Sequence, residues 1–585
     1  MEKDGEILLI LLPFWPPLIP PMGLACLKGF LQRHGFEVKA VDANVEDRFR
    51  RLYDDYFNLL NEVIPEELKG NFYNTGIDVL QNHMMAHLHR QESRSGRQAY
   101  WSLLKAIVAQ NFFQDLEEAR LRQLDRLIDG FYRRLTDYLA ELLEEERPAV
   151  LGISAFKGTL PASLFAFRFA RRSHPHIMTV LGGGIFADQL AVGSADFDYF
   201  LERTPYIDKI IVGEGELLFL KMLRGQLPPA RRLLTPQVLD GEVLALEAAE
   251  LPDFSDFDTA HYPQMAAYTS RSCPFQCGFC AETVNWGRYR KKSVPQVADE
   301  LTRLYRQYGS RLYLMSDSLL NPIIDDLASE LLKLDLPLYW DGYLRAAPQA
   351  GKEENTFLWR RGGFYRARLG LESGSARMLA RMNKGISPAE IRAALTNLAA
   401  AGIKTSTYWV IGYPGETEED FLATLKLLEE LKDDIYEAEC NPFRFYLSGQ
   451  VQSNRWANNH RPRPVYPPEA TQLLILQTWT IPDVSPVRQE IYRRLNRFVA
   501  LCRRLEIPNP YCGYDIYRAD ERWHRLHPNA VPPLVAFSGG PLAGAGEGEK
   551  MGAESHECRK VRPLRRASKV EAAAGDFDFT DNQER

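Results

Sequence analysis

The sequence predicts an α/β protein with two parallel β-sheets in succession, followed by a smaller mixed and helical region. The first sheet opens with residues 7–12, a continuous apolar run typical of a parallel strand that helices cover on both faces. Leucines at helical spacing then lead to Gly35 and a second strand at residues 36–41, which completes a βαβ unit. A second alternation of strands and helices begins at Met265. We therefore expect an open, doubly wound sheet followed by a partial barrel.

The first sheet is interrupted by a polar stretch from about residue 47 to residue 147 that has helical periodicity. Its apolar stripe predicts helices that pack as ordinary core. The α/β pattern then resumes with strands expected at residues 150–154, 178–181 and 209–212. The last two are followed by Gly182-Gly183-Gly184 and by Gly213-Glu214-Gly215-Glu216. Glycines at the carboxyl ends of strands place adaptable backbone where open sheets bind ligands.

The second unit has six candidate strands, which suits a partial (β/α)6 barrel with its chemistry in the carboxyl-end loops. They are expected at residues 266–269, 312–315, 338–340, 365–369, 405–411 and 444–447. We divide the chain into a first domain (1–230, insertion included), a linker (231–262), the barrel (263–466), a helical and aromatic region (467–538) and a tail (539–585). The tail is rich in Gly, Ala and charge, which predicts disorder.

Composition excludes several classes of function. The 585 residues are 45% apolar and 25% charged, with a formal net charge of −6, and this mildly acidic balance disfavours nucleic acid as the main partner. Prolines break the first apolar run, which is too short for a signal peptide or a membrane span, and no other stretch is long enough. We therefore expect a cytoplasmic protein, in which clustered cysteines indicate metal binding or catalysis.

Three cysteines lie close together after the first expected strand of the barrel: Cys273, Cys277 and Cys280, spaced C-x3-C-x2-C. Three thiolates can hold three irons of a 4Fe–4S cube and leave the fourth iron open to an external ligand. Structural zinc is the alternative interpretation, but closed zinc sites use four ligands, usually as two pairs. Neither a second cysteine pair nor a nearby histidine is present. The other cysteines are scattered and favour buried or incidental thiols.

The cysteine motif, with the aromatic Phe279 before its last cysteine, resembles the signature of the radical S-adenosylmethionine (radical SAM) superfamily. Further segments resemble strand-end segments of that family's barrel: residues 314–317 after the second strand, 341–345 at the third, 366–375 at the fourth and 409–417 at the sixth. The resemblance implies that Cys273, Cys277 and Cys280 hold a 4Fe–4S cluster whose open iron chelates S-adenosylmethionine. An electron from a protein such as flavodoxin or ferredoxin would cleave it to a 5′-deoxyadenosyl radical, which abstracts hydrogen from the substrate.

The same resemblance assigns candidate cofactor residues in the barrel: Asp317, Arg345, Glu372, Ser373 and Gly412. Glu372 would accept hydrogen bonds from the ribose or the amino group, Asp317 would meet the amino group and Arg345 the carboxylate. Gly412 would let the backbone approach the adenine. A cap or a surface ion pair stays an alternative for each polar residue. We expect Glu416 and Thr417 to begin the next helix, and Glu416 not to bind a ligand.

The first domain resembles the cobalamin-binding domain that precedes the barrel in one large class of radical SAM enzymes. The matching candidate residues lie near the ends of expected strands and in the loops after them: Pro20, Gly23, Asp42, Ser154, Gly182, Gly183, Gly213 and Glu214. The D-x-H-x-x-G motif that supplies a histidine ligand to cobalt in many cobalamin proteins is missing. No axial ligand is therefore predicted, and a domain that has lost the cofactor stays an alternative.

The two resemblances together imply radical methyl transfer to an unactivated carbon or phosphorus centre of a small-molecule or peptide substrate, with methylcobalamin as the donor. Such a centre is not nucleophilic, so a cofactor must carry the chemistry. Two alternatives stay open: a radical SAM enzyme with a vestigial cobalamin domain that performs hydrogen abstraction, cyclisation or rearrangement, and a non-catalytic Fe–S or cobalamin sensor. Methylthiolation of transfer RNA is set aside because that family brings three further N-terminal cysteines, whereas only Cys26 precedes the motif here.

Overall fold

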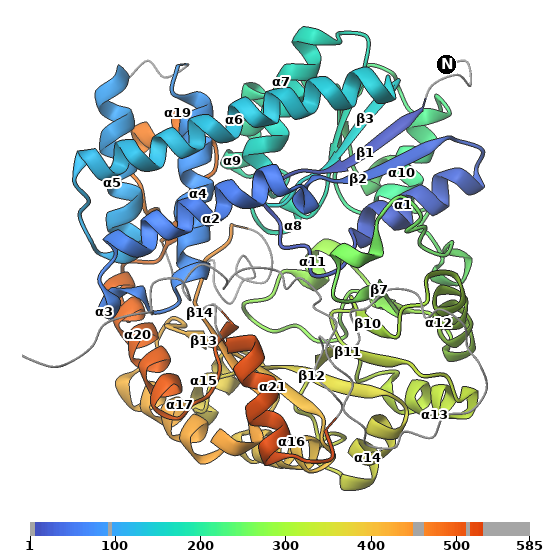
Figure 1. The fold of residues 1–585 in the computed structure, drawn as a ribbon, viewed down its shortest axis with the longest axis vertical. Coiled ribbons are helices and arrows are strands. Elements are labelled where there is room, and N and C mark those ends of the chain that lie inside the picture. The colour runs from blue at the N-terminus through green and yellow to red at the C-terminus, as the bar shows by residue number, and fades with distance from the viewer. Residues whose placement is uncertain (1–5, 92–95, 448–460, 511–514, 531–585) are drawn as a thin grey trace, which may run out of the picture.

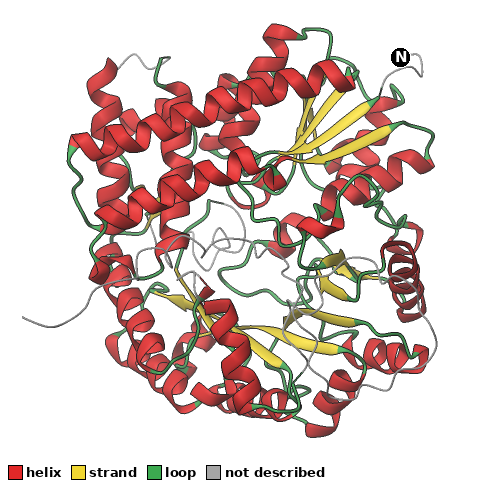
Figure 2. Ribbon diagram, in the orientation of Figure 1, coloured by secondary structure: helices red, strands yellow, loops and turns green. Residues whose placement is uncertain are grey.

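The computed structural model describes residues 6–91, 96–447, 461–510 and 515–530. It contains two six-stranded parallel sheets, which lie in the upper and lower halves of the molecule as drawn in Figures 1 and 2. The predicted disordered tail, residues 539–585, lies outside the described residues. No helix in the described ranges combines the length and the apolar character needed to cross a bilayer.

The first sheet has the strand order β2-β1-β3-β4-β5-β6. Its strands are β1 (Ile7–Leu11), β2 (Val38–Asp42), β3 (Val150–Ser154), β4 (Met178–Gly182), β5 (Lys209–Ile211) and β6 (Leu233–Leu234). Side chains of β1 alternate between two apolar cores: Ile7 and Leu9 face one, Leu8 and Ile10 the other. A strand covered on both faces needs this continuous apolar run, which is why the sequence revealed it. The two-residue β6 falls in the expected linker and was not predicted.

Helices cover both faces of this sheet (Figure 1). They are α1 (Met22–Arg33), α7 (Leu160–Ser173), α8 (Ile185–Asp188), α9 (Ala195–Arg203) and α10 (Gly215–Leu223). Five more helices lie between β2 and β3: α2 (Asp47–Val63), α3 (Glu66–Lys69), α4 (Phe72–His89), α5 (Gly96–Phe112) and α6 (Glu118–Glu146). We call α2–α6 the insertion. Its α4 reaches the far end of the second sheet, where the Asn71 side-chain amide donates to the Cys440 carbonyl at 2.5 Å.

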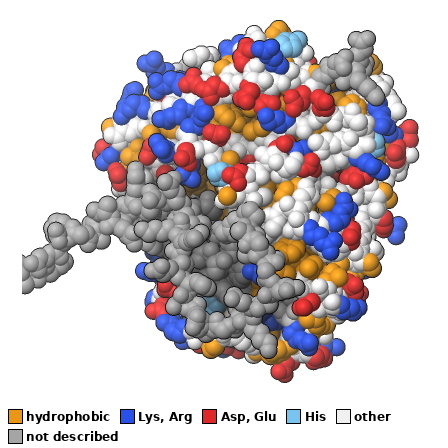
Figure 3. Space-filling view, turned by 45° about the vertical axis from the view of Figure 1, so that its right-hand side comes forward, with side chains coloured by type: hydrophobic (Ala, Val, Ile, Leu, Met, Phe, Trp, Pro, Cys, Tyr) orange, Lys and Arg blue, Asp and Glu red, His pale blue; other side chains and the backbone are white. Residues whose placement is uncertain are grey.

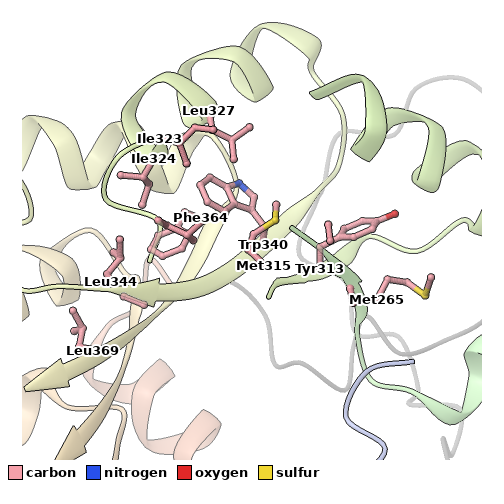
Figure 4. Close-up of a cluster of buried hydrophobic side chains, with 14 of the residues drawn as sticks. Met265, Tyr313, Met315, Ile323, Ile324, Leu327, Trp340, Leu344, Phe364 and Leu369 are labelled. Atoms are coloured by element: carbon pink, nitrogen blue, oxygen red, sulfur yellow. The ribbon is translucent and has the colours of Figure 1, made fainter. Parts of the chain in front are cut away.

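The second sheet has the order β7-β10-β11-β12-β13-β14 along one direction, with all neighbours parallel. Its strands are β7 (Met265–Ala267), β10 (Leu312–Met315), β11 (Tyr339–Leu344), β12 (Phe364–Glu372), β13 (Lys404–Ile411) and β14 (Glu437–Pro442). Outer helices are α12 (Val294–Tyr308), α13 (Ile324–Leu334), α14 (Glu353–Arg361), α15 (Ala376–Arg381), α16 (Pro388–Ala400) and α17 (Glu418–Glu430). Between sheet and helices lies a core in which Trp340 and Phe364 are almost fully buried (Figure 4).

The sixth strand lies earlier in the chain than expected. The predicted strand at residues 444–447 is wrong: β14 spans Glu437–Pro442, and Phe445 forms only an isolated bridge with Trp479. The strand was hidden because Glu437 and Glu439 interrupt the apolar pattern, although Glu437 is buried and accepts a hydrogen bond from the Ser406 hydroxyl. A short antiparallel hairpin, β8 (Ser270–Arg271) and β9 (Arg290–Lys291), was also not predicted.

The C-terminal region contributes α19 (Thr471–Leu474), the short strands β15 (Arg463–Pro464) and β16 (Trp479–Thr480), α20 (Arg488–Arg504) and α21 (Asp515–Leu526). The α19 helix packs on α4, and α20 packs on β14 and β13. The region therefore joins the insertion to the end of the barrel. On the face drawn in Figure 3, basic and acidic side chains are interspersed.

Candidate functional site

The three motif cysteines lie in one loop, which we call the cysteine loop (residues 272–281), between β8 and α11 (Glu282–Trp286). Three hydrogen bonds hold this loop in place, two through its backbone and one through the Ser272 side chain. The Gly278 N–H donates to the Met382 carbonyl at 2.7 Å, the Asn383 amide donates to the Gln276 carbonyl at 2.7 Å, and the Ser272 hydroxyl donates to the Gly287 carbonyl at 2.7 Å. The loop is thus tied to the segment after α15, which follows the fourth strand β12.

The thiols of this loop fit an iron–sulfur cube by their chemistry. Cys277 is buried, and Cys273 and Cys280 are half-buried. Burial raises the pKa of the Cys280 thiol to about 12, and a bound metal would reverse this by favouring the thiolate. No three His, Cys, Asp or Glu side chains of the described residues gather as ligands of a single ion. The thiolates of a cube bind different irons and so lie further apart than the ligands of one ion.

Arg345 lies directly beside the cysteine loop. Its Nη1 is 3.8 Å from the Cys277 Sγ, and its guanidinium carbon lies 3.9 Å from the centre of the Phe275 ring. The side chain is buried, and Asn321 holds the backbone at both the Arg345 N–H and the carbonyl. The structure therefore places this predicted residue at the end of β11, next to the motif, with its charge directed at the cysteines.

Glu372 lies at the carboxyl edge of the second sheet, at the end of β12, with a backbone φ of 64°. Its Oε1 accepts a hydrogen bond from Lys384 at 2.7 Å, and the Lys384 ammonium lies 5.8 Å from the centre of the Phe279 ring. Ser373 turns inward instead, since its hydroxyl accepts the Ser375 N–H and contacts Thr424. Of this predicted pair, Glu372 is linked to the cysteine loop through Lys384, and Ser373 supports the turn.

The Asp317 carboxylate accepts hydrogen bonds from other groups of the protein. Its Oδ1 and Oδ2 accept the Thr269 N–H at 3.0 and 2.9 Å, and Oδ1 also accepts the Thr269 hydroxyl at 2.8 Å and the Ser270 hydroxyl at 2.6 Å. These bonds use most of the acceptor capacity of a carboxylate. Burial nevertheless raises its pKa. Asp317 thus fixes the chain between β7 and β8, just before the cysteines, and this role differs from the predicted contact with an amino group.

Gly412 follows β13, which is the fifth strand of the sheet and not the sixth as the resemblance suggested. Its φ is 81°, and a Cβ there would lie 2.4 Å from Ile491 of α20. The Gly412 N–H donates to Glu416, which is 2% exposed and also accepts from Arg494 at 2.9 Å. Thr417, and not Glu416, caps α17. The expectation that Glu416 begins a helix is therefore wrong: it is a buried carboxyl that ties the turn to α20.

Replacing Glu416 by Gln is expected to flatten the pH dependence of stability. Burial raises the pKa of Glu416 to about 7, against 4.5 for an ordinary Glu, although Arg494 and the Gly412 N–H lower it. The folded chain therefore binds this proton more tightly than the unfolded chain. The resulting stabilisation is complete below the unfolded pKa and is lost as the pH rises through the folded pKa. Between about pH 5 and about pH 8, the wild type should lose about 3 kcal/mol relative to Glu416→Gln.

Urea unfolding followed by circular dichroism at several pH values measures this difference. Glu419→Gln, a change of the fully exposed neighbour in α17, is the matched control and should leave the wild-type profile unchanged. Parallel profiles for the wild type and Glu416→Gln would contradict the prediction.

The predicted residues of the first sheet lie along its carboxyl edge, and their surroundings differ. Asp42 is engaged, because it accepts hydrogen bonds from Asn44 and from the Tyr262 hydroxyl at 2.9 Å. Gly183, with a φ of 107°, has no room for a Cβ, which would lie 2.5 Å from the Ala155 nitrogen. By contrast, a Cβ on Gly182 would meet nothing closer than 3.8 Å.

Three other predicted residues of this edge make no side-chain hydrogen bond to another residue of the described ranges. Gly23, at the start of α1, is exposed, and a Cβ added to it would have nothing within 4 Å; Ser154 is half-buried at the end of β3. Pro20 is buried in the loop before α1. In the same loop, the Trp15 ring stacks on Phe156 with a centroid distance of 4.3 Å and stays 40% exposed. The carboxyl edge of the first sheet thus presents the aromatic rings of Trp15 and Phe156.

Glu214 is bound by arginines of the hairpin that flanks the cysteine loop. Arg271 of β8 contacts Glu214 at 2.7 Å and Glu216 at 2.5 Å, and Arg290 of β9 also pairs with Glu214. Gly213, with a φ of 99°, forms the turn that carries these carboxylates. We call these four charged residues the arginine–glutamate cluster. It fastens the carboxyl edge of the first sheet to the hairpin beside Cys273.

Sequence reasoning missed Arg271, Arg290 and Glu216 as site residues. A signal was present, because Arg271 lies two residues before Cys273, and Glu214 and Glu216 follow a strand end. Their pairing depends on how the turn after β5 meets the β8–β9 hairpin, and no local pattern specifies it.

Residues 268–428 match the family model described as the radical SAM superfamily. The chain is 25% identical over 334 residues to an uncharacterized methyltransferase of Pyrococcus horikoshii, covering 53% of this chain and 70% of the relative. It is 25% identical over 326 residues to the anaerobic magnesium-protoporphyrin IX monomethyl ester cyclase of Rubrivivax gelatinosus, covering 51% of this chain and 57% of the relative. The chain thus spans little more than half of that cyclase.

Among solved structures, the fold is similar to that of TsrM, a radical S-adenosylmethionine methyltransferase from Kitasatospora setae, solved with tryptophan substrate and a SAM analog. The TM-score is 0.56 at 16% identity, and the match covers 86% of this chain and 89% of TsrM. TsrM has also been solved with cobalamin and a [4Fe-4S] cluster, and that structure gives a TM-score of 0.54 at 15% identity, with 85% and 89% covered. The predicted fold class is confirmed. The matched domain implies a 4Fe–4S cluster and S-adenosylmethionine as cofactors.

Proposed function

We propose that this chain, a radical SAM enzyme by its domain at residues 268–428, also binds cobalamin and transfers a methyl group to an unactivated centre of a small-molecule or peptide substrate. One observation carries the proposal: the arginine–glutamate cluster fastens the open, glycine-containing edge of the first sheet to the hairpin beside the cysteines. The two edges that would hold the cofactors are therefore joined by protein contacts. The names of the Pyrococcus relative and of TsrM support methyl transfer, and the TsrM structure with cobalamin supports the second cofactor.

Each set of residues has a role in this proposal. Cys273, Cys277 and Cys280 hold the cluster. Arg345 binds the S-adenosylmethionine carboxylate, since its buried cation lies beside Cys277. Glu372 accepts hydrogen bonds from the ribose or the amino group, and Lys384 orients its carboxylate. The edge around Gly182 and Trp15 receives the cobalamin.

The bound cofactors supply an electron for S-adenosylmethionine cleavage and a carrier for the methyl group. For a substrate C–H bond, the overall reaction balances with two molecules of S-adenosylmethionine and two electrons from a flavodoxin- or ferredoxin-type donor. The products are the methylated substrate, methionine, 5′-deoxyadenosine and S-adenosylhomocysteine. The protein's own residues orient the reactants and keep the two cofactor edges together.

Gly182→Leu is expected to remove cobalamin without removing iron. Gly182 ends β4 in open space, and its φ is not among the positive values, so the backbone accepts a side chain there. A leucine would fill the edge where the cofactor is proposed to lie. The protein is purified without oxygen, reconstituted with iron and sulfide, incubated with cobalamin and desalted. The wild type should retain cobalamin and about four irons per chain, and the variant should retain the irons with cobalamin occupancy reduced at least about tenfold.

The ultraviolet–visible spectrum and the cobalt and iron contents provide the readout. The unchanged iron of Gly182→Leu is its internal control. Wild-type protein that binds iron and cleaves S-adenosylmethionine without retaining cobalamin would contradict the cobalamin proposal. Methylated product and S-adenosylhomocysteine from a substrate assay would distinguish methyl transfer from cyclisation.

A second candidate is a radical SAM enzyme whose first domain has lost cobalamin. The observation in its favour is that Asp42 and Glu214, both predicted cofactor residues, are engaged by protein groups, and that Trp15 covers Phe156. The similarity to the Rubrivivax cyclase supports a reaction other than methylation under this interpretation. A non-catalytic sensor would bind the cluster but would release no 5′-deoxyadenosine.

A further inference from the structure

A cavity of about 70 Å³ lies where the carboxyl ends of both sheets meet the insertion. The barrel contributes Gly412 after β13 and Arg444 after β14, and the first sheet contributes Lys157 after β3. The insertion contributes Asp78 of α4 and Asn111 of α5. Arg488, at the start of α20, completes the wall. Every major part of the fold therefore reaches this one cavity.

The charges that line the cavity do not balance. The Asp78 carboxylate accepts from Lys157 at 2.8 Å and from Arg444 at 2.9 and 2.5 Å. Although burial would raise the pKa of Asp78, these two cations hold it well below its usual range, so the group is ionised. One negative charge thus faces two positive ones. The aspartate cancels only one of them.

Arg488 adds a third cation. Its guanidinium donates to the Gln110 carbonyl, to Asn111 Oδ1 at 3.1 Å and to the Tyr492 hydroxyl at 3.2 Å. All three acceptors are neutral, and no carboxylate of the described chain segments pairs with this guanidinium. The described lining therefore holds three cations against one carboxylate, and a buried excess of positive charge attracts an anion.

One part of the cavity wall is apolar and adjoins the cysteine loop, while Gln189, Gln477, Thr478 and Thr480 add neutral polar groups elsewhere. Phe443, Phe445 and Ile481 line the cavity. The same three side chains belong to an apolar cluster that includes Tyr413 and Phe279, the aromatic residue before Cys280. A molecule in the cavity would therefore contact aromatic rings on the side toward the cysteines and cations on the side toward the insertion.

We infer that this cavity binds the anionic group of the substrate, and that the substrate is an anion whose aromatic or apolar body lies at the open side of the cavity, against the aromatic wall. Lys157 and Arg488 attract its carboxylate or phosphate group, while Phe443 and Phe445 pack on the rest. The insertion has a function in this arrangement, because Asp78 orients Lys157 and Arg444, and Asn111 orients Arg488. The inference takes the enzymatic role from the proposed function, but binding can be measured without turnover and without cobalamin.

The test uses three probes that share one ring and differ in charge: 3-phenylpropionate, 3-phenylpropanol and 3-phenylpropylamine. Binding to the full chain reconstituted with its cluster is measured by ligand-observed NMR titration at low ionic strength. We expect 3-phenylpropionate to bind about tenfold more tightly than the alcohol, and the amine to bind least. Lys157→Gln and Arg488→Gln should each weaken 3-phenylpropionate about tenfold and leave the alcohol unchanged.

Arg493→Gln is the matched control, since Arg493 lies on the same helix as Arg488 but is exposed and pairs with Glu490. It should bind all three probes as the wild type does. Both cavity variants should keep the wild-type unfolding midpoint, because Lys157→Gln leaves Asp78 paired with Arg444 and Arg488→Gln keeps a donor for Asn111.

Equal binding of the three probes, unchanged binding of the anion by both cavity variants, or no binding of any probe at millimolar concentration would overturn the inference. A protein that fails to retain cobalamin but binds 3-phenylpropionate with this charge dependence would contradict the cobalamin proposal alone. The two failures are therefore distinguishable.

Discussion

Cys277→Ala is expected to abolish iron–sulfur binding and S-adenosylmethionine cleavage. Cys277 is the most buried of the three motif thiols and lies beside Arg345, at the centre of the cysteine loop. Two thiolates cannot hold three corners of a cube. Loss of an outer-shell partner already costs about 10- to 100-fold in metal affinity or activity, so loss of a ligand should cost more than about 100-fold. Iron content and 5′-deoxyadenosine release in the presence of dithionite measure the effect.

Cys502→Ala is the matched control. Cys502 is buried in α20, within the apolar core, and takes no part in the motif. The Cys502→Ala variant should bind iron and cleave S-adenosylmethionine as the wild type does. Circular dichroism should show that both variants are folded. Full iron content and undiminished cleavage in Cys277→Ala would exclude the proposed ligand set.

Asp341→Asn, a change of a buried carboxyl in the barrel, is expected to lower the free energy of unfolding strongly. Asp341 is fully buried and accepts from Arg366 at 2.8 Å, from Arg368 at 2.9 Å and from Gln264 at 3.0 Å. Burial would raise the pKa of this carboxyl, and the two guanidiniums lower it below its usual range. Neutralising it leaves the buried Arg366 and the half-buried Arg368 with only one carboxylate, Glu437 at 3.8 Å from Arg366, as compensation among the described residues. The expected cost is about 4 kcal/mol.

Urea unfolding measures this loss. Asp299→Asn serves as the control, because Asp299 is 67% exposed and lies 3.9 Å from Arg303 in a surface pair. Such pairs contribute less than about 1 kcal/mol. Similar unfolding free energies for the two variants would show that the buried network does not hold the barrel together.

The sequence predicted those parts of the fold that depend on local pattern. The strands β1 and β3 were found because both faces of each are buried, which leaves a continuous apolar run. The strand β14 was missed because its buried Glu437 is satisfied by Ser406 on the neighbouring strand, a partner that the local pattern does not reveal. The motif cysteines were likewise found from spacing alone.

In the candidate site, the cysteines could be predicted because clustered thiols indicate metal binding. Polar residues such as aspartate and glutamate could not, because they have many possible roles. Asp317 and Glu214 were assigned to cofactors because each lies in a segment that resembles a strand-end segment of the family, and ligands bind at such strand ends. The structure gives both of them protein partners instead: Thr269 for Asp317, and Arg271 for Glu214. Those partners lie 48 and 57 residues away in the chain, so sequence spacing carried no signal for them.

The contact between α4 and β14 bears on how the chain folds. Asn71 and Cys440, which meet there, are 369 residues apart, and the Asp78–Arg444 pair lies nearby. During synthesis the helix leaves the ribosome long before the strand that it will hold, so the last strand of the barrel docks onto a surface made much earlier. A fragment that began at β7 would leave the Cys440 carbonyl and the Arg444 charge without these partners. We therefore expect the insertion and the barrel to unfold together, and contacts between segments so far apart in the chain slow folding.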